Sequence, residues 1–206
     1  MKAIFWDTET TGLPLFKEPS SDPRQPHIVQ LAAALVDLDE KHVISSIDVI
    51  TKPDGWEIPE EVSKIHGITT EMAMECGIPE HQALELFLSL FTDASGELKK
   101  SIAHNEQFDA RIIRIALKRF GHDEESIDAF EDRDKYCTMR ESTKIVQCPP
   151  TAKMKAAGRN HFKNPNLSEA YKHFTGKELS GAHNAMVDVK ACMNVYFGIQ
   201  KHEATN

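Results

Sequence analysis

The most informative segment of this chain reads Ile4-Phe5-Trp6-Asp7-Thr8-Glu9-Thr10-Thr11-Gly12-Leu13, a short apolar run followed by two acids and a turn. Side chains alternate between the two faces of a strand, so Asp7 and Glu9 project from the same face. Two neighbouring carboxylates repel each other unless a cation holds them, and such oxygen ligands suit Mg²⁺ or Mn²⁺. Asp-x-Glu alone is also compatible with two solvated acids, so the interpretation depends on the rest of the sequence.

Two further acids are predicted on the buried faces of helices. Asp109 precedes Ile112 and Ile113 by three and four residues in a helix that stops at Gly121. Asp188 shares a face with the apolar residues of the last long helix. A buried carboxylate needs a cation, a hydrogen-bonding partner or a raised pKa. One such residue is more often a cap or an ion-pair partner, but acids pointing inward from a strand and two helices favour a metal site.

A histidine accompanies the last acid. His183 lies five residues before Asp188, next to Gly181 and the predicted helix start, which indicates an exposed lip above the metal site. A neutral imidazole in that place could accept a proton from an attacking water near neutral pH. The alternative is an ordinary histidine near a helix N-terminus.

The ordered set Asp7-x-Glu9, Asp109 and His183-x-x-x-x-Asp188 resembles the DEDDh 3′→5′ exonucleases, which include the proofreading epsilon subunit of bacterial DNA polymerase III. Other segments look like those of the family and follow the same order, namely Thr10-Thr11-Gly12-Leu13, Ile28-Val29-Gln30-Leu31, His66-Gly67-Ile68-Thr69, His104-Asn105 with Phe108, and Cys137-Thr138-Met139. Together these segments cover nearly the whole chain, and such agreement in context is what a motif match requires.

The resemblance implies a ribonuclease H-like α/β fold, with a mixed central sheet flanked by helices, in a single exonuclease domain over residues 1–206. It implies two-metal hydrolysis of the terminal phosphodiester of preferably single-stranded DNA to nucleoside 5′-monophosphates. The metal ligands for two Mg²⁺ or Mn²⁺ ions would be Asp7, Glu9, Asp109 and Asp188, and His183 would be the general base. The substrate-binding residues would be Thr10, Gly12, Leu13, His66, His104, Asn105 and Phe108.

Two other functions stay open. One is an RNA 3′→5′ exonuclease of the same family, because no residue readable in the sequence decides whether a 2′-hydroxyl is accepted. The other is an inactive, replication-associated nucleic-acid-binding module, although a binding module needs no general base.

Hydrophobic periodicity predicts a meander of strands followed by alternating helices and strands. The strands are predicted at residues 2–7, 28–37, 42–51, 101–104 and near 135–138. The helices are predicted at residues 59–65 and 79–91, around Asp109, and near 141–146, 167–174 and 184–200. The acidic stretch from 123 to 134 is predicted to be a solvated loop.

Two further segments are unusual in composition, and the first is longer than the minimal family loop. Residues 14–27 contain four prolines and are predicted to be a disordered surface insertion, with the shaping of substrate access as the alternative. Residues 150–165 are basic and are predicted to be a flexible loop beside the active site, with a solvated connection as the alternative. The residues of this basic loop proposed to contact phosphates are Lys153, Lys155, Arg159 and Lys163.

The formal net charge of the chain is −8, whereas proteins that grip long duplexes usually present a basic face. We therefore expect weak, salt-sensitive binding to the last few nucleotides of a free 3′ end, with DNA favoured over RNA. Two modes of action stay open, a free-standing exonuclease and a proofreader with a DNA polymerase as its partner, in replication, proofreading or repair. No apolar run reaches membrane-spanning length, and the four cysteines are widely spaced. The expectation is a cytoplasmic protein with reduced thiols and no membrane partner.

Overall fold

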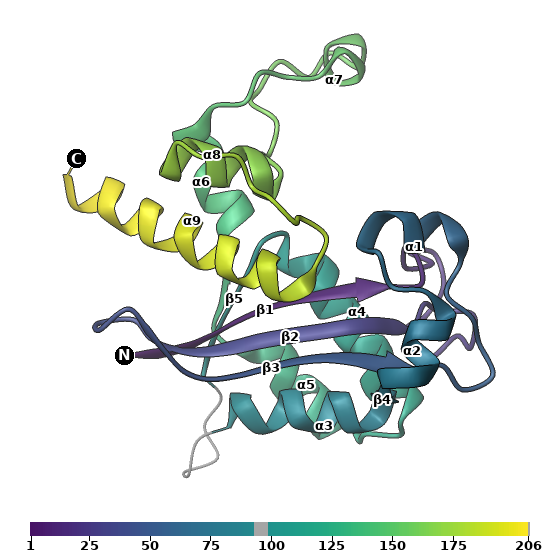
Figure 1. The fold of residues 1–206 in the computed structure, drawn as a ribbon. Helices are drawn as coiled ribbons and strands as arrows, with labels where there is room; N and C mark the ends of the chain where they lie inside the picture. The colour runs from purple at the N-terminus through teal and green to yellow at the C-terminus, as the bar shows by residue number, and fades with distance from the viewer. Residues whose placement is uncertain (93–98, 206) are drawn as a thin grey trace.

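A mixed central sheet organises the protein in the computed structural model, which describes residues 1–92 and 99–205 (Figure 1). The strands within these ranges form one sheet in the order β4-β3-β2-β1-β5-β6. Their bounds are β1 Lys2–Thr10, β2 Ile28–Asp37, β3 His42–Lys52, β4 Ile78–Pro79, β5 Lys100–Ala103 and β6 Lys135–Cys137. The first three strands form an antiparallel meander, and β5 and β6 continue the sheet in parallel with β1.

Helices cover both faces of this sheet. In Figure 1, α9 crosses one face and α3 and α5 lie on the other, while α1 and α2 gather beyond the arrowhead of β1. The helices are α1 Glu60–His66, α2 Thr70–Cys76, α3 Glu80–Phe91, α4 Glu106–Arg119, α5 Glu124–Asp132, α6 Thr138–Val146, α7 Ala152–Ala156, α8 Leu167–Thr175 and α9 Ala185–Thr205. The strand meander and the later alternation of helices and strands agree with the predicted order.

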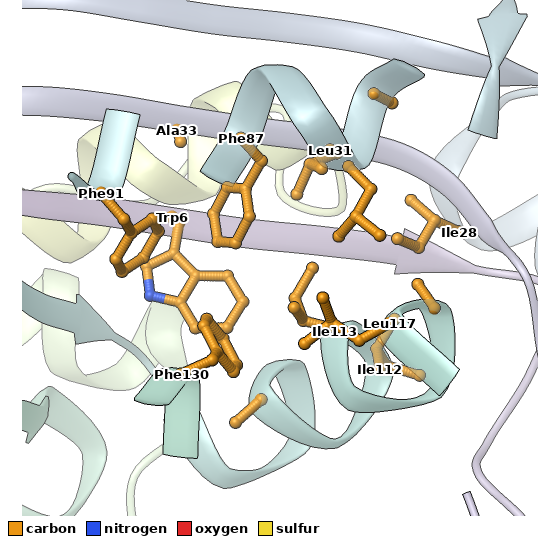
Figure 2. Close-up of a cluster of buried hydrophobic side chains, with 14 of the residues drawn as sticks. Trp6, Ile28, Leu31, Ala33, Phe87, Phe91, Ile112, Ile113, Leu117 and Phe130 are labelled. Carbon is orange, nitrogen blue, oxygen red and sulfur yellow. The ribbon is translucent and has the colours of Figure 1, made fainter. Parts of the chain in front are cut away.

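An aromatic cluster fills the core on the face of α3, α4 and α5 (Figure 2). The Trp6 ring lies 5.1 Å from Phe87, 6.3 Å from Phe91 and 6.2 Å from Phe130, measured between ring centroids. Its Nε1 donates a hydrogen bond to the Ser101 hydroxyl at 2.8 Å, so the indole has no unpaired polar group. Because side chains alternate along β1, Trp6 enters this core while its neighbour Asp7 faces the side of α9.

The acidic stretch after α4 is a helix, and the prediction of a solvated loop there is wrong. Asp123 caps α5 by accepting a hydrogen bond from the Ser126 backbone N–H. Ile127 and Phe130 lie three residues apart and are both buried in the aromatic cluster. The acids therefore occupy the outer face of an amphipathic helix. With only two buried residues among the nine of α5, the helical period of apolar residues is too weak for the sequence to distinguish this helix from a loop.

Residues 14–27 form a folded loop, so the predicted disorder is also wrong. The buried Gln25 amide donates to the carbonyls of Leu15 and Pro19 and accepts from the Leu15 N–H at 2.9 Å. Arg119 of α4 donates to the carbonyls of Gln25 and Pro26, at 2.7 and 3.0 Å. These side chains satisfy backbone groups that otherwise depend on water, and they tie the loop to the body of the protein.

Smaller differences concern the limits of elements. β1 continues to Thr10, so Asp7 and Glu9 lie within the strand, and Thr138 begins α6 instead of ending β6. Part of the predicted basic loop is the short helix α7, which stands away from the sheet in Figure 1. All four cysteines are free in the structure. A search of the described residues finds no helix with both the length and the apolar character needed to cross a membrane.

Candidate active site

Four carboxylates influence one another around the C-terminal half of β1. Asp7 and Glu9 belong to this strand, Asp109 to the first half of α4, and Asp188 to the first turn of α9. Burial, followed by the charges of the three other acids, raises the pKa of Asp7 well above its usual range. The strand and the two helices thus bring the four predicted acids together. We call these four side chains the acidic cluster.

Burial is also the largest cause of the raised pKa values of the other three acids. Burial, with the charges of Asp188 and Asp109, raises the pKa of Glu9 to about 8. Burial raises the pKa of Asp109 to about 7, although hydrogen bonds from Thr8 oppose the shift. Burial also raises the pKa of Asp188. Carboxylates in such surroundings favour a bound proton or a bound cation over the free anion.

Thr8 orients the carboxylate of Asp109. The Asp109 Oδ1 atom accepts hydrogen bonds from the Thr8 backbone N–H at 3.1 Å and from its hydroxyl at 2.7 Å. Thr8 is buried and lies between Asp7 and Glu9, on the opposite face of β1. Sequence reasoning missed this residue because it considered only the acidic face of the strand. A buried threonine at the centre of Asp-x-Glu is the signal that could have found it.

The start of α9 is fixed by Gln30 of β2. The Gln30 side-chain oxygen accepts from the Ala185 N–H at 3.1 Å, and its nitrogen donates to Asp48 at 2.7 Å. One turn into the helix, Asp188 Oδ2 accepts from the His183 N–H at 3.0 Å. Sequence reasoning gave Gln30 no role, although a glutamine inside the apolar run of β2 indicates a buried polar contact.

The carboxylate of Asp188 is only half satisfied. Its Oδ1 is buried and, among the described residues, has no hydrogen-bond partner. Glu9, His183 and Asp188 each offer one ligand atom, and these atoms lie within 4.8 Å of one another. A buried acceptor without a partner is costly, and carboxylate oxygens are ligands that Mg²⁺ and Mn²⁺ prefer. The residues present therefore fit a divalent cation.

His183 is exposed and has a left-handed backbone, with φ of 66°. This conformation is uncommon for a residue other than glycine, and the hydrogen bond from its N–H to Asp188 helps to hold it. The imidazole is near enough to Glu9 and Asp188 to ligate the same ion or to accept a proton from a water bound there.

His66 lies beside His183. Burial, and next the charge of His183, lower the pKa of His66. Its Nδ1 accepts a hydrogen bond from the Ile68 N–H at 3.1 Å, so the proton of the neutral ring is on Nε2. This Nε2–H group is buried and has no partner in the described part of the chain. It is an available hydrogen-bond donor next to the acidic cluster.

His104 is occupied by contacts within the protein. Its Nε2 lies 3.1 Å from the Pro165 carbonyl, which can only accept, so Nε2 carries the proton. Nδ1 then accepts from the Thr138 hydroxyl at 3.0 Å. Burial lowers the pKa of His104 to about 4, which keeps the ring neutral. His104 thus joins the end of β5 to the segment before α8, and its predicted contact with substrate stays a prediction.

The other predicted substrate-binding residues surround the ends of β1 and β5. The Thr10 hydroxyl donates to the Gly12 carbonyl at 2.8 Å in the turn after β1, and Leu13 beyond it is 73% exposed. Asn105 has a left-handed backbone immediately before α4. Phe108 is half-buried and packs against the aromatic core, so at least part of its role is structural.

The predicted phosphate contacts fall into two groups. Lys153, Lys155 and Arg159 are exposed on or next to α7. Lys163 is half-buried and forms an ion pair with Glu169 of α8 at 2.5 Å. Only the first three are displayed to solvent in the way that a nucleic-acid contact requires.

The metal-free protein should lose stability as the pH rises from about 6.5 to 8. Groups with a raised pKa in the folded state, here Glu9 and Asp109, bind protons that the unfolded chain has released. Each such proton lowers the free energy of unfolding by up to about 1.4 kcal/mol per pH unit. Below about pH 6.5 the depressed pKa values of His66 and His104 oppose this trend, because the unfolded histidines take up protons.

Thermal unfolding with chelator checks this expectation, and Mg²⁺ or Mn²⁺ should raise the melting temperature most at the upper end of the range. Glu9→Gln should flatten the dependence on pH. Glu60→Gln, at an exposed acid of α1, is the matched control and should leave it unchanged. A chelated protein with a constant or rising melting temperature over this range would contradict the prediction.

One family model and two relatives match this chain. The family model described as Exonuclease (RNase_T) matches residues 4–196. A relative named DNA polymerase III PolC-type, from Thermotoga petrophila, is 31% identical over 118 residues, which are 56% of this chain and 7% of the relative. The counterpart from Thermotoga maritima is 30% identical over 116 residues, again 7% of its length.

Solved structures share the fold. E. coli Exonuclease I in complex with a dT13 oligonucleotide superposes with a TM-score of 0.73 at 21% identity, over 99% of this chain and 42% of that chain. Exonuclease I from Methylocaldum szegediense gives a TM-score of 0.66 at 19% identity, over 98% of this chain and 41% of that chain. The chain thus spans less than half the length of these neighbours and a small fraction of the polymerase relatives.

Proposed function

The chain belongs to the exonuclease family whose model it matches, and from this membership we propose that it is a metal-dependent 3′→5′ exonuclease acting on single-stranded DNA. The family and the ribonuclease H-like α/β fold are those predicted from the sequence, and both predictions are confirmed. The observation that carries the proposed activity is the cluster of four carboxylates with raised pKa values, with His183 beside Glu9 and Asp188.

In this proposal Asp7, Glu9, Asp109 and Asp188 would hold two divalent ions. The Oδ1 of Asp188, which has no hydrogen-bond partner in residues 1–92 and 99–205, and the raised pKa values of the cluster support a cation there. Ions of this kind, when bound, lower the pKa of a water molecule and stabilise the charge on the leaving oxygen. Oxygen ligands favour Mg²⁺ or Mn²⁺ for this role.

The remaining steps fall to side chains of the chain itself. His183 would accept the proton of the attacking water at a ring nitrogen, and its exposure leaves the ring free to pass that proton to solvent. The Nε2–H group of His66 would donate to a phosphate or sugar oxygen of the terminal nucleotide. Leu13 and Phe108 would contact the terminal base and exclude water. The product would be a nucleoside 5′-monophosphate.

We further propose that residues 1–206 act as one exonuclease domain on a free 3′ end, with DNA favoured over RNA. Support for DNA comes from the Exonuclease I neighbour that binds a dT13 oligonucleotide and from the relatives named as DNA polymerases. The same relatives support a DNA polymerase as a partner in replication, proofreading or repair. An RNA exonuclease of the same family is the alternative, and acceptance of a 2′-hydroxyl is the property that separates the two.

Matched DNA and RNA strands of one sequence, labelled at the 5′ end, test this function. With Mg²⁺ we expect a ladder of progressively shortened DNA strands, and with chelator no ladder. Faster trimming of RNA would assign the enzyme to RNA. A complete absence of shortening on both strands would leave a nucleic-acid-binding module as the function.

Reversing the charges of Lys153 and Lys155 should weaken the binding of long strands. If both residues contact phosphates, the doubly substituted protein (Lys153→Glu and Lys155→Glu) should show a Michaelis constant about two- to fivefold higher per contact. The salt dependence of binding should fall by about one unit of slope per contact. Lys201→Glu, near the C-terminal end of α9, is the control. An unchanged Michaelis constant and salt slope would remove α7 from the binding surface.

A further inference from the structure

A hydrogen-bonded turn in the loop of residues 14–27 displays an aromatic and a cationic side chain. The Glu18 N–H donates to the Leu15 carbonyl at 2.9 Å, which closes a turn with Phe16 and Lys17 at its two central positions. Phe16 is 69% exposed, and Lys17 beside it is exposed as well. A single exposed apolar residue is common on protein surfaces. Whether Phe16 has a functional role therefore depends on how rigidly the turn is held and where it lies.

The turn is held at both of its ends. The side chain of Gln25 is bonded to both the N–H and the carbonyl of Leu15, at 2.9 and 3.2 Å. At the other end, Arg111 of α4 donates to the Glu18 carbonyl at 2.7 Å. Phe16 is therefore presented on a fixed backbone, and a preorganised aromatic side chain loses little conformational entropy when it binds.

The turn is linked to the acidic cluster by the chain and by α4. Phe16 follows Glu9 by seven residues, a separation that spans at most roughly 25 Å when fully extended. The loop contacts α4 through Arg111, which is two residues after Asp109. The turn thus packs on the helix that carries Asp109 and is at most roughly 25 Å from Glu9.

We propose that Phe16 and Lys17 form a stacking platform for single-stranded nucleic acid, on which the Phe16 ring stacks against a base upstream of the scissile bond and Lys17 contacts a neighbouring phosphate. The proposal rests on the proposed exonuclease function and adds a contact outside the acidic cluster. Stacking is tolerant of sequence because every base has a π-face. Since bases in a duplex are already stacked on each other, such a platform favours single strands.

Kinetics on two substrates test the platform. One is an oligothymidylate of about ten nucleotides, and the other is the p-nitrophenyl ester of thymidine 5′-monophosphate, which has no upstream nucleotide. Phe16→Ala should lower the ratio of the two kcat/KM values, oligonucleotide to ester, by about five- to hundredfold, the effect of losing one stacked base. Phe16→Trp should keep the ratio, because a larger ring stacks at least as well.

Leu86→Ala is the matched control, because Leu86 is another exposed apolar residue, 44% exposed on the outer side of α3. A wild-type ratio in Phe16→Ala, or an equally low ratio in Phe16→Trp, would overturn the platform. If the wild type hydrolyses neither substrate, the proposed function fails instead. Fluorescence anisotropy with a labelled strand then tests the platform alone: weaker binding by Phe16→Ala supports it and equal binding overturns it.

Discussion

Asp7→Asn is expected to lower the release of mononucleotides by about three orders of magnitude, the scale on which loss of one preorganised electrostatic group acts. Asn keeps the shape of the side chain but removes the charge that the proposed ions require. The same substitution removes a carboxylate whose pKa is raised by burial and, next, by the charges of the other acids, so the chelated protein should become more stable near pH 8. Activity and stability should therefore change in opposite directions.

Single-turnover release from a labelled strand and thermal unfolding with chelator measure the two effects. Asp22→Asn is the control, because Asp22 pairs with Arg24 on the surface of the loop of residues 14–27 and lies outside the acidic cluster. A simple loss of folding would lower both quantities together. More than about a tenth of the wild-type rate in Asp7→Asn would be incompatible with the proposed metal site.

His183→Ala is expected to lower turnover by about two to four orders of magnitude, as loss of a general base does. Metal binding should persist, because the four carboxylates remain. The stabilisation of the folded protein by Mn²⁺ measures metal binding independently of activity. His42→Ala, at an exposed histidine of β3, should leave both quantities unchanged.

The proximity of His183 to Glu9 and Asp188 gives this experiment a second outcome of interest. If the imidazole is a ligand, His183→Ala should lower the stabilisation by Mn²⁺ together with the rate. If it is the general base, the rate falls and the stabilisation stays. A variant with nearly the wild-type rate would exclude both roles.

The parts of this protein that the sequence predicted well are those with local signals. Each of these signals is contained in a short segment of the sequence. Examples are the apolar runs of β1 and β2, the helical period of α3 and α4, and the acids on the inward faces of these elements. Strand alternation alone places Asp7 and Glu9 on one face. The resemblance to a family then supplied the order in which these local signals combine.

What the sequence did not predict depends on contacts between distant residues. The loop of residues 14–27 is ordered by Arg119, which is about ninety positions away, and by a glutamine whose burial no local pattern reveals. Thr8 and Gln30 orient the acidic residues from positions that resemble ordinary strand residues. Propensity treats prolines and charges as signs of a loop, but tertiary hydrogen bonds decide whether that loop is folded.

The alternation of Trp6 and Asp7 on β1 restricts how this protein can change over evolutionary time. A one-residue insertion or deletion in the first half of the strand would exchange its two faces, sending carboxylates into the aromatic core and the indole toward α9. A substitution in β1 changes one side chain on one face, whereas a change of length moves the side chains of both faces at once. Changes of chain length are better tolerated after the strand. The loop of residues 14–27 lies outside β1, so a change in its length leaves the register of β1 with its neighbouring strands intact.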